Sequence, residues 1–151
     1  MKLSSTVADL HQMIRASKLK PLGFVPTMGA LHNGHLSLVE TAVERCPLVI
    51  VSIFVNPTQF NDKNDLKNYP RTLDEDLAML QGVLRHDDIV FTPAVEEIYP
   101  SEDKRVFHFG NLDRVMEALH RPGHFNGVAQ VVSRLFDITD PDYAFFGQKD
   151  F

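Results

Sequence analysis

The run LVIVSIFV at residues 48–55 constrains the fold of this chain more than any other segment. It is almost wholly apolar and rich in β-branched side chains, which favour strands. A strand with one wet face alternates apolar and polar residues, and this run does not. We therefore expect a strand that is covered on both faces, as in a parallel sheet flanked by helices.

The rest of the chain alternates between strand and helix patterns around this run. We expect strands over residues 22–27, 48–55, 88–91, 106–109 and 143–146, and helices over 6–18, 36–46, 73–84, 112–119 and 125–136. This order predicts an α/β fold, a Rossmann-like parallel sheet with right-handed crossovers. Ligands of such sheets bind at the carboxyl ends of the strands.

The segments between these elements carry their own signals. Residues 56–71 form a long polar connection, and connections of this length are usually functional or mobile. Thr72 and Glu75 are spaced as in a capping box, which predicts the helix start at residue 73. Residues 93–100 are expected to form a loop in which Glu96 and Glu97 are a solvated acidic pair.

Composition bounds the function. The 151 residues, 44% of them hydrophobic, suit one domain spanning residues 1–151. A net charge of −5 gives no general affinity for nucleic acid or for an anionic membrane. A single cysteine, Cys46, excludes an internal disulfide and favours a cytoplasmic location, and the N-terminus lacks the apolar core of a signal peptide. The chain ends one residue after a GQKD turn, without a helix to cover its last strand, so we expect the front part of a longer protein.

The stretch PTMGALHNGH at residues 26–35 is the strongest candidate for a binding site. A strand hands over to a helix there, and a helix N-terminus attracts phosphate groups. Gly29 and Gly34 allow close backbone approach, and His32 and His35, three residues apart, share one helix face. Two surface histidines would be the plain alternative. A metal pair ranks lower, because it needs a third ligand.

The same stretch resembles known proteins. H-N-G-H resembles the H-x-G-H signature of the nucleotidylyltransferase superfamily. The longer run PTMGALHNGHLSLV resembles the pantothenate synthetase (pantoate–β-alanine ligase) family, as do four later segments in the same order: SIFVNPTQF, YPRTLDEDL, RPGHFNGVAQVV and FFGQKD. The resemblance covers essentially the whole chain. It implies an ATP- and pantoate-binding domain, truncated before the family's C-terminal domain and its later Ser/Arg-rich phosphate-binding segment.

The resemblance also implies a reaction and its ligands. Pantoate would attack the α-phosphorus of ATP to form an acyl adenylate, and β-alanine would then displace AMP to give pantothenate. ATP is a co-substrate, Mg²⁺ assists, and the family is commonly homodimeric. No protein ligands for the metal are implied.

Site residues follow from the resemblance, position by position. His35 and His32 would be catalytic. The implied ATP-binding residues are Met28, Gly29, Ala30, Leu31, His32, Asn33, Gly34, His35, Gly147, Gln148, Lys149 and Asp150. The implied substrate-binding residues are Gln59, Pro26, Asn56, Tyr69, Arg121, His124, Val131 and Val132.

Other functions stay open at this point. Another adenylyl- or cytidylyltransferase would share H-x-G-H, but NPTQF and RPGHFNGV are not typical of those enzymes. A chain of this length could also be a binding module that holds ATP or pantoate without turnover. A metal hydrolase is the remaining alternative.

Overall fold

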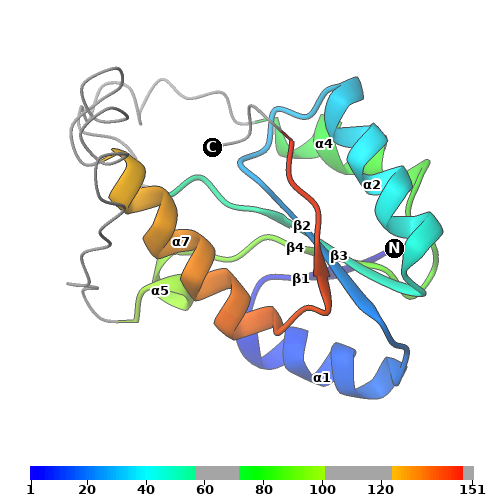
Figure 1. The fold of residues 1–151 in the computed structure, drawn as a ribbon, viewed down its shortest axis with the longest axis horizontal. Coiled ribbons are helices and arrows are strands. Elements are labelled where there is room, and N and C mark those ends of the chain that lie inside the picture. Colours follow the sequence, from blue (N-terminus) through cyan, green and yellow to red (C-terminus); the bar gives the residue numbers. More distant parts are fainter. Residues whose placement is uncertain (57–71, 101–123, 148–151) are drawn as a thin grey trace.

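The computed structural model describes residues 1–56, 72–100 and 124–147. Strands and helices alternate along the chain, as the sequence predicts (Figure 1). The elements are β1 (Lys2–Ser4), α1 (Val7–Ser17), β2 (Leu22–Thr27), α2 (Asn33–Arg45), β3 (Leu48–Ile53), α4 (Leu73–Gln81), β4 (Ile89–Phe91), α5 (Val95–Ile98), α7 (His124–Thr139) and β5 (Tyr143–Ala144).

The five strands form one sheet in the order β1-β4-β3-β2-β5, and every neighbouring pair is parallel. The chain builds the sheet outward in one direction from β2 through β3 to β4, and then returns to place β5 on the other side of β2. The boundary between the paired strands β2 and β5 is therefore a topological switch point. Crevices for ligands form at such a point, outside the carboxyl ends of the strands.

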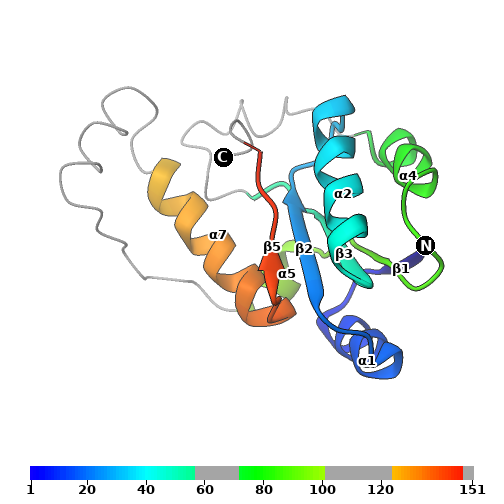
Figure 2. The same cartoon turned by 45° about the vertical axis from the view of Figure 1, so that its right-hand side comes forward.

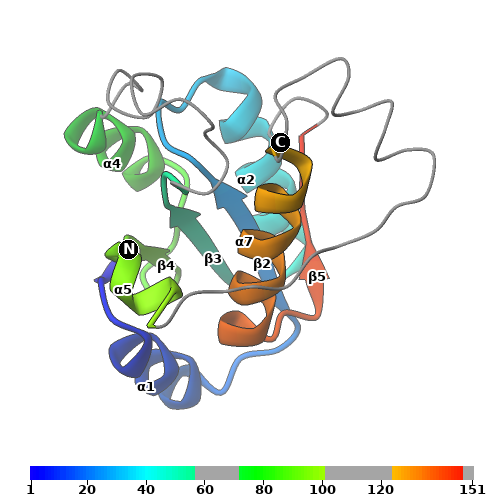
Figure 3. The ribbon, with the colours of Figure 1, turned by 90° about the vertical axis from the view of Figure 1, so that its left-hand side faces the viewer.

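Helices cover both faces of the sheet (Figures 2 and 3). On one face Phe24 and Ile50 pack with residues of α1, α5 and α7. On the other face Val25 and Val51 pack with residues of α2 and α4. Adjacent residues of one strand thus enter opposite cores, which explains why β2 and β3 are apolar almost throughout.

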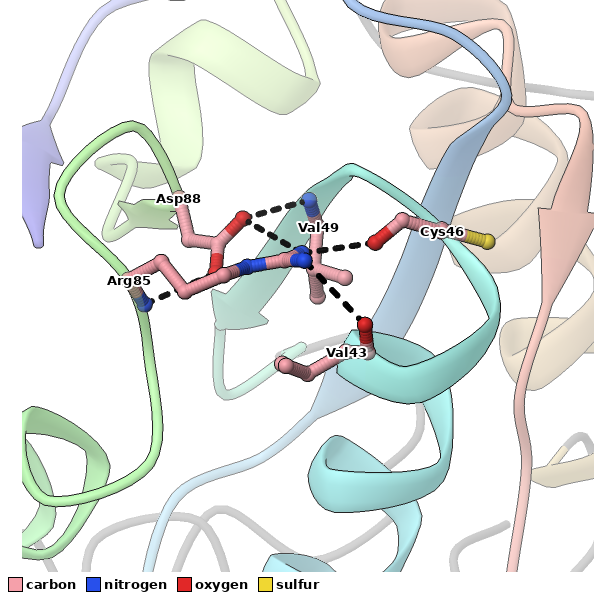
Figure 4. A network of polar contacts seen from close by, with 5 residues as sticks. All are labelled: Val43, Cys46, Val49, Arg85 and Asp88. Atoms are coloured by element: carbon pink, nitrogen blue, oxygen red, sulfur yellow. Dashed lines mark hydrogen bonds and ion pairs between the residues drawn. The ribbon is translucent and has the colours of Figure 1, made fainter.

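An ion pair lies near the start of β3 (Figure 4). We call this side of the sheet, where the parallel strands begin, its amino-terminal edge, and the side where they end its carboxyl-terminal edge. The Arg85 Nε atom lies 2.9 Å from Asp88 Oδ2, and the fully buried Asp88 also accepts from the Val49 N–H at 2.9 Å. The Arg85 guanidinium donates to the carbonyls of Val43 and Cys46, at the end of α2. One side chain pair therefore joins the end of a helix to the start of the next strand.

Several sequence predictions need correction. Helix α2 begins at Asn33, three residues before the predicted start, because His32 acts as its N-cap. The capping box predicted at Thr72 is wrong, since Thr72 makes no side-chain cap hydrogen bond. Residues 95–98 form a short helix where a loop was expected. Glu97 is not simply solvated, because its carboxylate accepts from the Val7 N–H at 2.6 Å.

Other boundaries are close to prediction. β2 matches its predicted range, β3 ends two residues early, and α7 runs three residues further than expected. Strand β1 was not predicted, and the strand and helix expected over 106–109 and 112–119 lie outside the described residues. Within the described part of the chain, no helix combines the length and the apolar character that crossing a bilayer requires.

Candidate active site

The candidate site is built on the turn that follows β2, residues 28–32. Two consecutive residues of this turn have positive φ, Gly29 at 81° and Ala30 at 50°. A Cβ atom on Gly29 would lie 3.1 Å from Asp76 Oδ2 and 3.2 Å from the Ile53 side chain. Glycine is required there both for the backbone angle and for the lack of space.

His32 and His35 lie together at the start of α2, with ring centroids 4.0 Å apart and planes inclined by 40°. The two residues cap the helix reciprocally. His32 Nδ1 accepts from the Gly34 N–H at 3.0 Å, and His35 Nδ1 accepts from the His32 N–H at 3.2 Å. The sequence prediction that both rings share one face of the helix start is confirmed in this geometry.

These hydrogen bonds indicate the tautomer of each ring in its neutral form. A neutral imidazole carries one N–H, and its other nitrogen is an acceptor. Because both Nδ1 atoms accept from backbone N–H groups, the proton of each neutral ring resides on Nε2. Each ring is therefore set up as an Nε2–H donor, the form needed to bind the oxygen of an anion.

Asp76, in α4, hydrogen-bonds to the backbone of the turn. The sequence did not predict this role. Its side chain is 2% exposed. Oδ2 accepts from the Ala30 N–H at 3.0 Å, Oδ1 accepts from the Leu31 N–H at 2.9 Å, and the Thr72 hydroxyl donates to Oδ1 at 3.2 Å. No local pattern could reveal a partnership across 45 residues, and the apparent capping box gave Thr72 a different partner.

The second predicted ATP segment starts at the other side of the switch point. β5 pairs with β2 through Gly23–Tyr143 and Phe24–Ala144, so the chain after β5 leaves the sheet beside the turn after β2. Gly147 is the last residue of this segment that the structure describes. Gln148, Lys149 and Asp150 lie outside the described residues.

Apart from Asn56, the predicted substrate residues divide into three groups. Pro26 lies buried in β2, and Val131, 2% exposed, belongs to the core under α7, with Val132 packed beside it. His124 opens α7, but its side chain lies outside the described part. Gln59, Tyr69 and Arg121 also lie outside it.

Asn56 is fully buried beyond the end of β3. Its amide donates to the Gly127 carbonyl at 3.0 Å and accepts from the Tyr99 hydroxyl at 3.2 Å. Both contacts tie the end of the strand to α7 and to the segment after α5. Asn56 thus has a structural role, and its direct contact with pantoate stays a prediction.

A pocket of about 330 Å³ borders the histidine turn on the side of β3 and β4. Met28, Gly29 and Asp76 belong to its lining, together with Thr72, Leu73 and residues 53–55 and 92–95. The lining is mostly apolar, with Thr72, Asp76 and Thr92 among the few side chains that offer polar groups. A small organic molecule could bind there against the turn that carries the histidines.

Comparison with known sequences identifies the family to which these segments belong. Residues 2–151 match the family model described as pantoate–β-alanine ligase. A pantothenate synthetase of Porphyromonas gingivalis is 54% identical over 153 aligned residues, and one of Phocaeicola vulgatus is 57% identical. Each alignment covers 100% of this chain and 54% of the relative, so the chain spans about half the length of the curated relatives it matches.

Solved structures show the same fold. The pantothenate synthetase of Thermus thermophilus superposes with a TM-score of 0.83 at 46% identity, covering 95% of this chain and 51% of that one. The pantoate–β-alanine ligase of Francisella tularensis, solved with β,γ-ATP and β-alanine, gives 0.86 at 41% identity, covering 95% and 55%. With its parallel sheet, its histidine turn and a match over residues 2–151, this chain belongs to the pantoate–β-alanine ligase family.

Proposed function

We propose that this chain supplies the ATP- and pantoate-binding part of an enzyme that condenses pantoate with β-alanine. The observation that carries the proposal is the pair of imidazoles at the carboxyl end of β2, whose Nδ1 atoms both accept from backbone N–H groups and so leave Nε2 as the donor, beside the switch point. A switch point is where an α/β sheet binds nucleotides, and an imidazole pair suits the oxygens of a triphosphate. The Francisella tularensis structure was solved with β,γ-ATP and β-alanine, that is, with a nucleotide and with the amine of the proposed reaction.

The reaction has two steps. A carboxylate oxygen of pantoate attacks the α-phosphorus of ATP, the bond to the bridging oxygen breaks, and pyrophosphate leaves. The amine of β-alanine then attacks the acyl carbon of the pantoyl adenylate, AMP leaves, and the amine releases a proton. Phosphoryl transfer of this kind depends mainly on positioning and on charge stabilisation.

His32 and His35 would provide charge stabilisation. Negative charge develops on the α-phosphoryl oxygens and on the leaving pyrophosphate, and fixed N–H donors stabilise it without reorganisation. Rings 4.0 Å apart can donate to oxygens of the same phosphoryl group or of neighbouring ones. Removal of one such donor typically lowers the rate by about 100- to 1000-fold.

Mg²⁺ is part of the proposal as a counter-ion of the phosphates. The described residues contain no group of three His, Cys, Asp or Glu side chains that could hold a metal ion. We propose that the ion is held mainly through substrate phosphates and water, which is usual for Mg²⁺. When bound, it would neutralise phosphate charge. The proposal further includes a homodimer in the cytoplasm, and light scattering on the purified chain tests the dimer.

Pyrophosphate release on mixing this chain with ATP, Mg²⁺ and pantoate tests the function. We expect release that depends on pantoate, and AMP formation once β-alanine is added. Since the chain spans about half the length of its relatives, a second outcome is binding without turnover, as a nucleotide-binding module. Binding of pantoate and ATP without pyrophosphate release would support that second function, and absence of binding would contradict both.

Single-turnover measurements test the histidines. His35→Ala should lower the rate of adenylate formation by about 100-fold or more, with ATP and pantoate binding within about tenfold of wild type. His86→Ala is the matched control, because His86 is exposed beside the opposite edge of the sheet. An unchanged rate in His35→Ala would remove His35 from the mechanism.

For the substrate site, Gln59→Ala should weaken pantoate binding far more than ATP binding in calorimetric titrations.

A further inference from the structure

We infer that Asp76 is a positioning residue for the histidine turn: its carboxylate fixes the backbone of Ala30 and Leu31 and thereby sets the direction of both imidazole donors. The inference rests on the proposed function, since it gives Asp76 a role in binding the triphosphate. Asp76 itself is not proposed to touch the ligand.

The contacts of Asp76 are matched to the turn. Its two oxygens each accept one of two consecutive backbone N–H groups, Ala30 at 3.0 Å and Leu31 at 2.9 Å. The Thr72 hydroxyl, donating to Oδ1 at 3.2 Å, fixes the carboxylate from the other side. Only a carboxylate has two acceptor oxygens and no N–H of its own, so an amide cannot satisfy both backbone donors.

The turn depends on these contacts because its backbone is otherwise unfavourable. Ala30 has φ of 50°, a left-handed conformation that side chains other than glycine rarely adopt. Such a conformation persists only when surrounding contacts impose it. Buried backbone N–H groups also need acceptors. Asp76 meets both needs from a helix that lies 45 residues further along the chain.

The histidines follow directly after this anchor. Leu31 precedes His32, whose N–H donates to His35 Nδ1 and whose own Nδ1 accepts from Gly34. If the turn at Ala30 and Leu31 relaxes, the His32 backbone rotates and the two Nδ1 hydrogen bonds weaken. The protons then redistribute between Nδ1 and Nε2, and the donors no longer converge.

The charge of Asp76 strengthens the argument. A carboxylate in the wall of a site for phosphate repels the ligand unless other groups offset its charge. Within the described part of the chain, no cation pairs with Asp76, and only the N–H and hydroxyl donors named above compensate it. An acidic side chain at this place is explained by the two donors that it must satisfy, and not by attraction for the ligand.

The test uses nitrogen-15 NMR of the histidine rings in the 151-residue chain without ligand. Wild type should show His32 and His35 as Nε2–H tautomers, and slow hydrogen exchange of the Ala30 and Leu31 amides. Asp76→Asn should mix the tautomers of both rings and speed exchange of at least one of the two amides by about tenfold or more. Asp74→Asn is the matched control, since Asp74 is exposed in the first turn of the same helix.

ATP titration gives the second readout. Asp76→Asn should weaken ATP several-fold, up to the about tenfold limit expected for loss of a histidine donor itself, while Asp74→Asn stays within about twofold. If wild type fails to bind ATP, the proposed function fails, and the tautomers still decide the role of Asp76. If Asp76→Asn keeps the wild-type tautomers and amide protection, the positioning role is overturned, whatever happens to ATP binding.

A milder variant covers the case in which Asp76→Asn does not fold. Thr72→Val removes the hydroxyl that orients the carboxylate but keeps both backbone hydrogen bonds. We expect the same changes of tautomer and ATP affinity at a smaller size, a few-fold in the dissociation constant, and their reversal in Thr72→Ser. Wild-type behaviour of Thr72→Val in both readouts would overturn the inference.

Discussion

The two edges of the sheet each contain a buried aspartate with a different kind of partner. At the amino-terminal edge, Asp88 is fully buried and pairs with the Arg85 guanidinium at 2.9 Å. At the carboxyl-terminal edge, Asp76 is 2% exposed and, among the described residues, accepts only from backbone N–H groups and a hydroxyl. The Asp88 carboxylate pairs with a cation, whereas the Asp76 carboxylate accepts from the backbone of a turn with positive φ at Gly29 and Ala30.

The two aspartates therefore have different roles: Asp88 stabilises the fold, and Asp76 orients the histidine turn. Together with Arg85, Asp88 joins the end of α2 to the start of β3, which are two regular elements. Removal of its charge leaves Arg85 without its ion-pair partner and the Val49 N–H without an acceptor, which destabilises the whole fold. Asp76 contacts a turn that lies between β2 and α2 and is part of neither element. Its loss should disturb the local geometry of the site more than the stability of the sheet.

The largest expected effect is the loss of stability in Asp88→Ala. Removal of one partner of a buried ion pair costs about 3–5 kcal/mol, and we expect the low end because the Arg85 side chain is 40% exposed. Urea unfolding followed by circular dichroism measures the change. The ring tautomers of His32 and His35 should not change in the folded fraction. A change there would mean that the two edges are coupled.

Asp76→Asn should cost less stability but disturb the site. One buried N–H loses its acceptor, which costs about 1–3 kcal/mol of unfolding free energy. The same urea experiment measures it, next to Asp88→Ala. If Asp76→Asn destabilises the fold as much as Asp88→Ala does, both aspartates serve the core, and the contrast between the edges is lost.

Gly29→Ala tests the turn by its backbone. A φ of 81° and close contacts to Asp76 and Ile53 predict a loss of about 1–2 kcal/mol. Gly82→Ala is the matched control, because its added Cβ would meet no heavy atom closer than the Met79 carbonyl at 3.6 Å. That variant should be neutral or more stable by about 0.5 kcal/mol. Equal thermal stability of the two variants would show that the turn adapts.

The smallest effect concerns Cys46, whose carbonyl accepts from Arg85 at the amino-terminal edge. Burial, followed by the nearby Asp142 carboxylate, raises the pKa of the Cys46 thiol. The folded chain therefore holds this proton to higher pH than the unfolded chain. The resulting stability is fully present below the ordinary thiol pKa and is lost as the pH rises through the folded-state pKa.

Urea unfolding between about pH 7 and 10 measures this dependence against Cys46→Ala. The free-energy difference between the two proteins should be constant near neutral pH and shrink in the alkaline range, by at most about 1.4 kcal/mol per pH unit. A constant difference over the whole range would mean that the thiol is not desolvated in the folded state.

Elements with a strong local signal were predictable from the sequence. β2 and β3 were found because a run that is apolar at almost every position has few alternatives to a strand covered on both faces. The histidine turn was found because glycines and histidines at a strand end point to a ligand. The start of α2 was misplaced, since histidine is not among the usual N-cap residues and the capping here uses Nδ1 atoms.

Features that depend on tertiary contacts were not predictable. The structural contacts of Asp76 and Asn56 are with partners 46 and 71 residues away. Asp88 pairs locally with Arg85, but its bond to Val49 joins residues 39 positions apart. β1 and α5 are too short, at three and four residues, to show a period. For such elements the neighbouring strand or helix decides the conformation, and local preference does not.

The position of β5 next to β2 has a consequence for the order in which the chain folds. β2 can pair with β3 as soon as β3 has been made, but its other neighbour, β5, is made much later. The acceptor of the Leu22 N–H, the Asp142 carboxylate, is likewise 120 residues further along the chain. During synthesis, one edge of an apolar central strand therefore stays open, which is the condition under which strands pair with the wrong chain. The contact that completes the proposed nucleotide crevice is thus among the slowest to form, because long-range parallel pairing carries the largest loop-closure entropy.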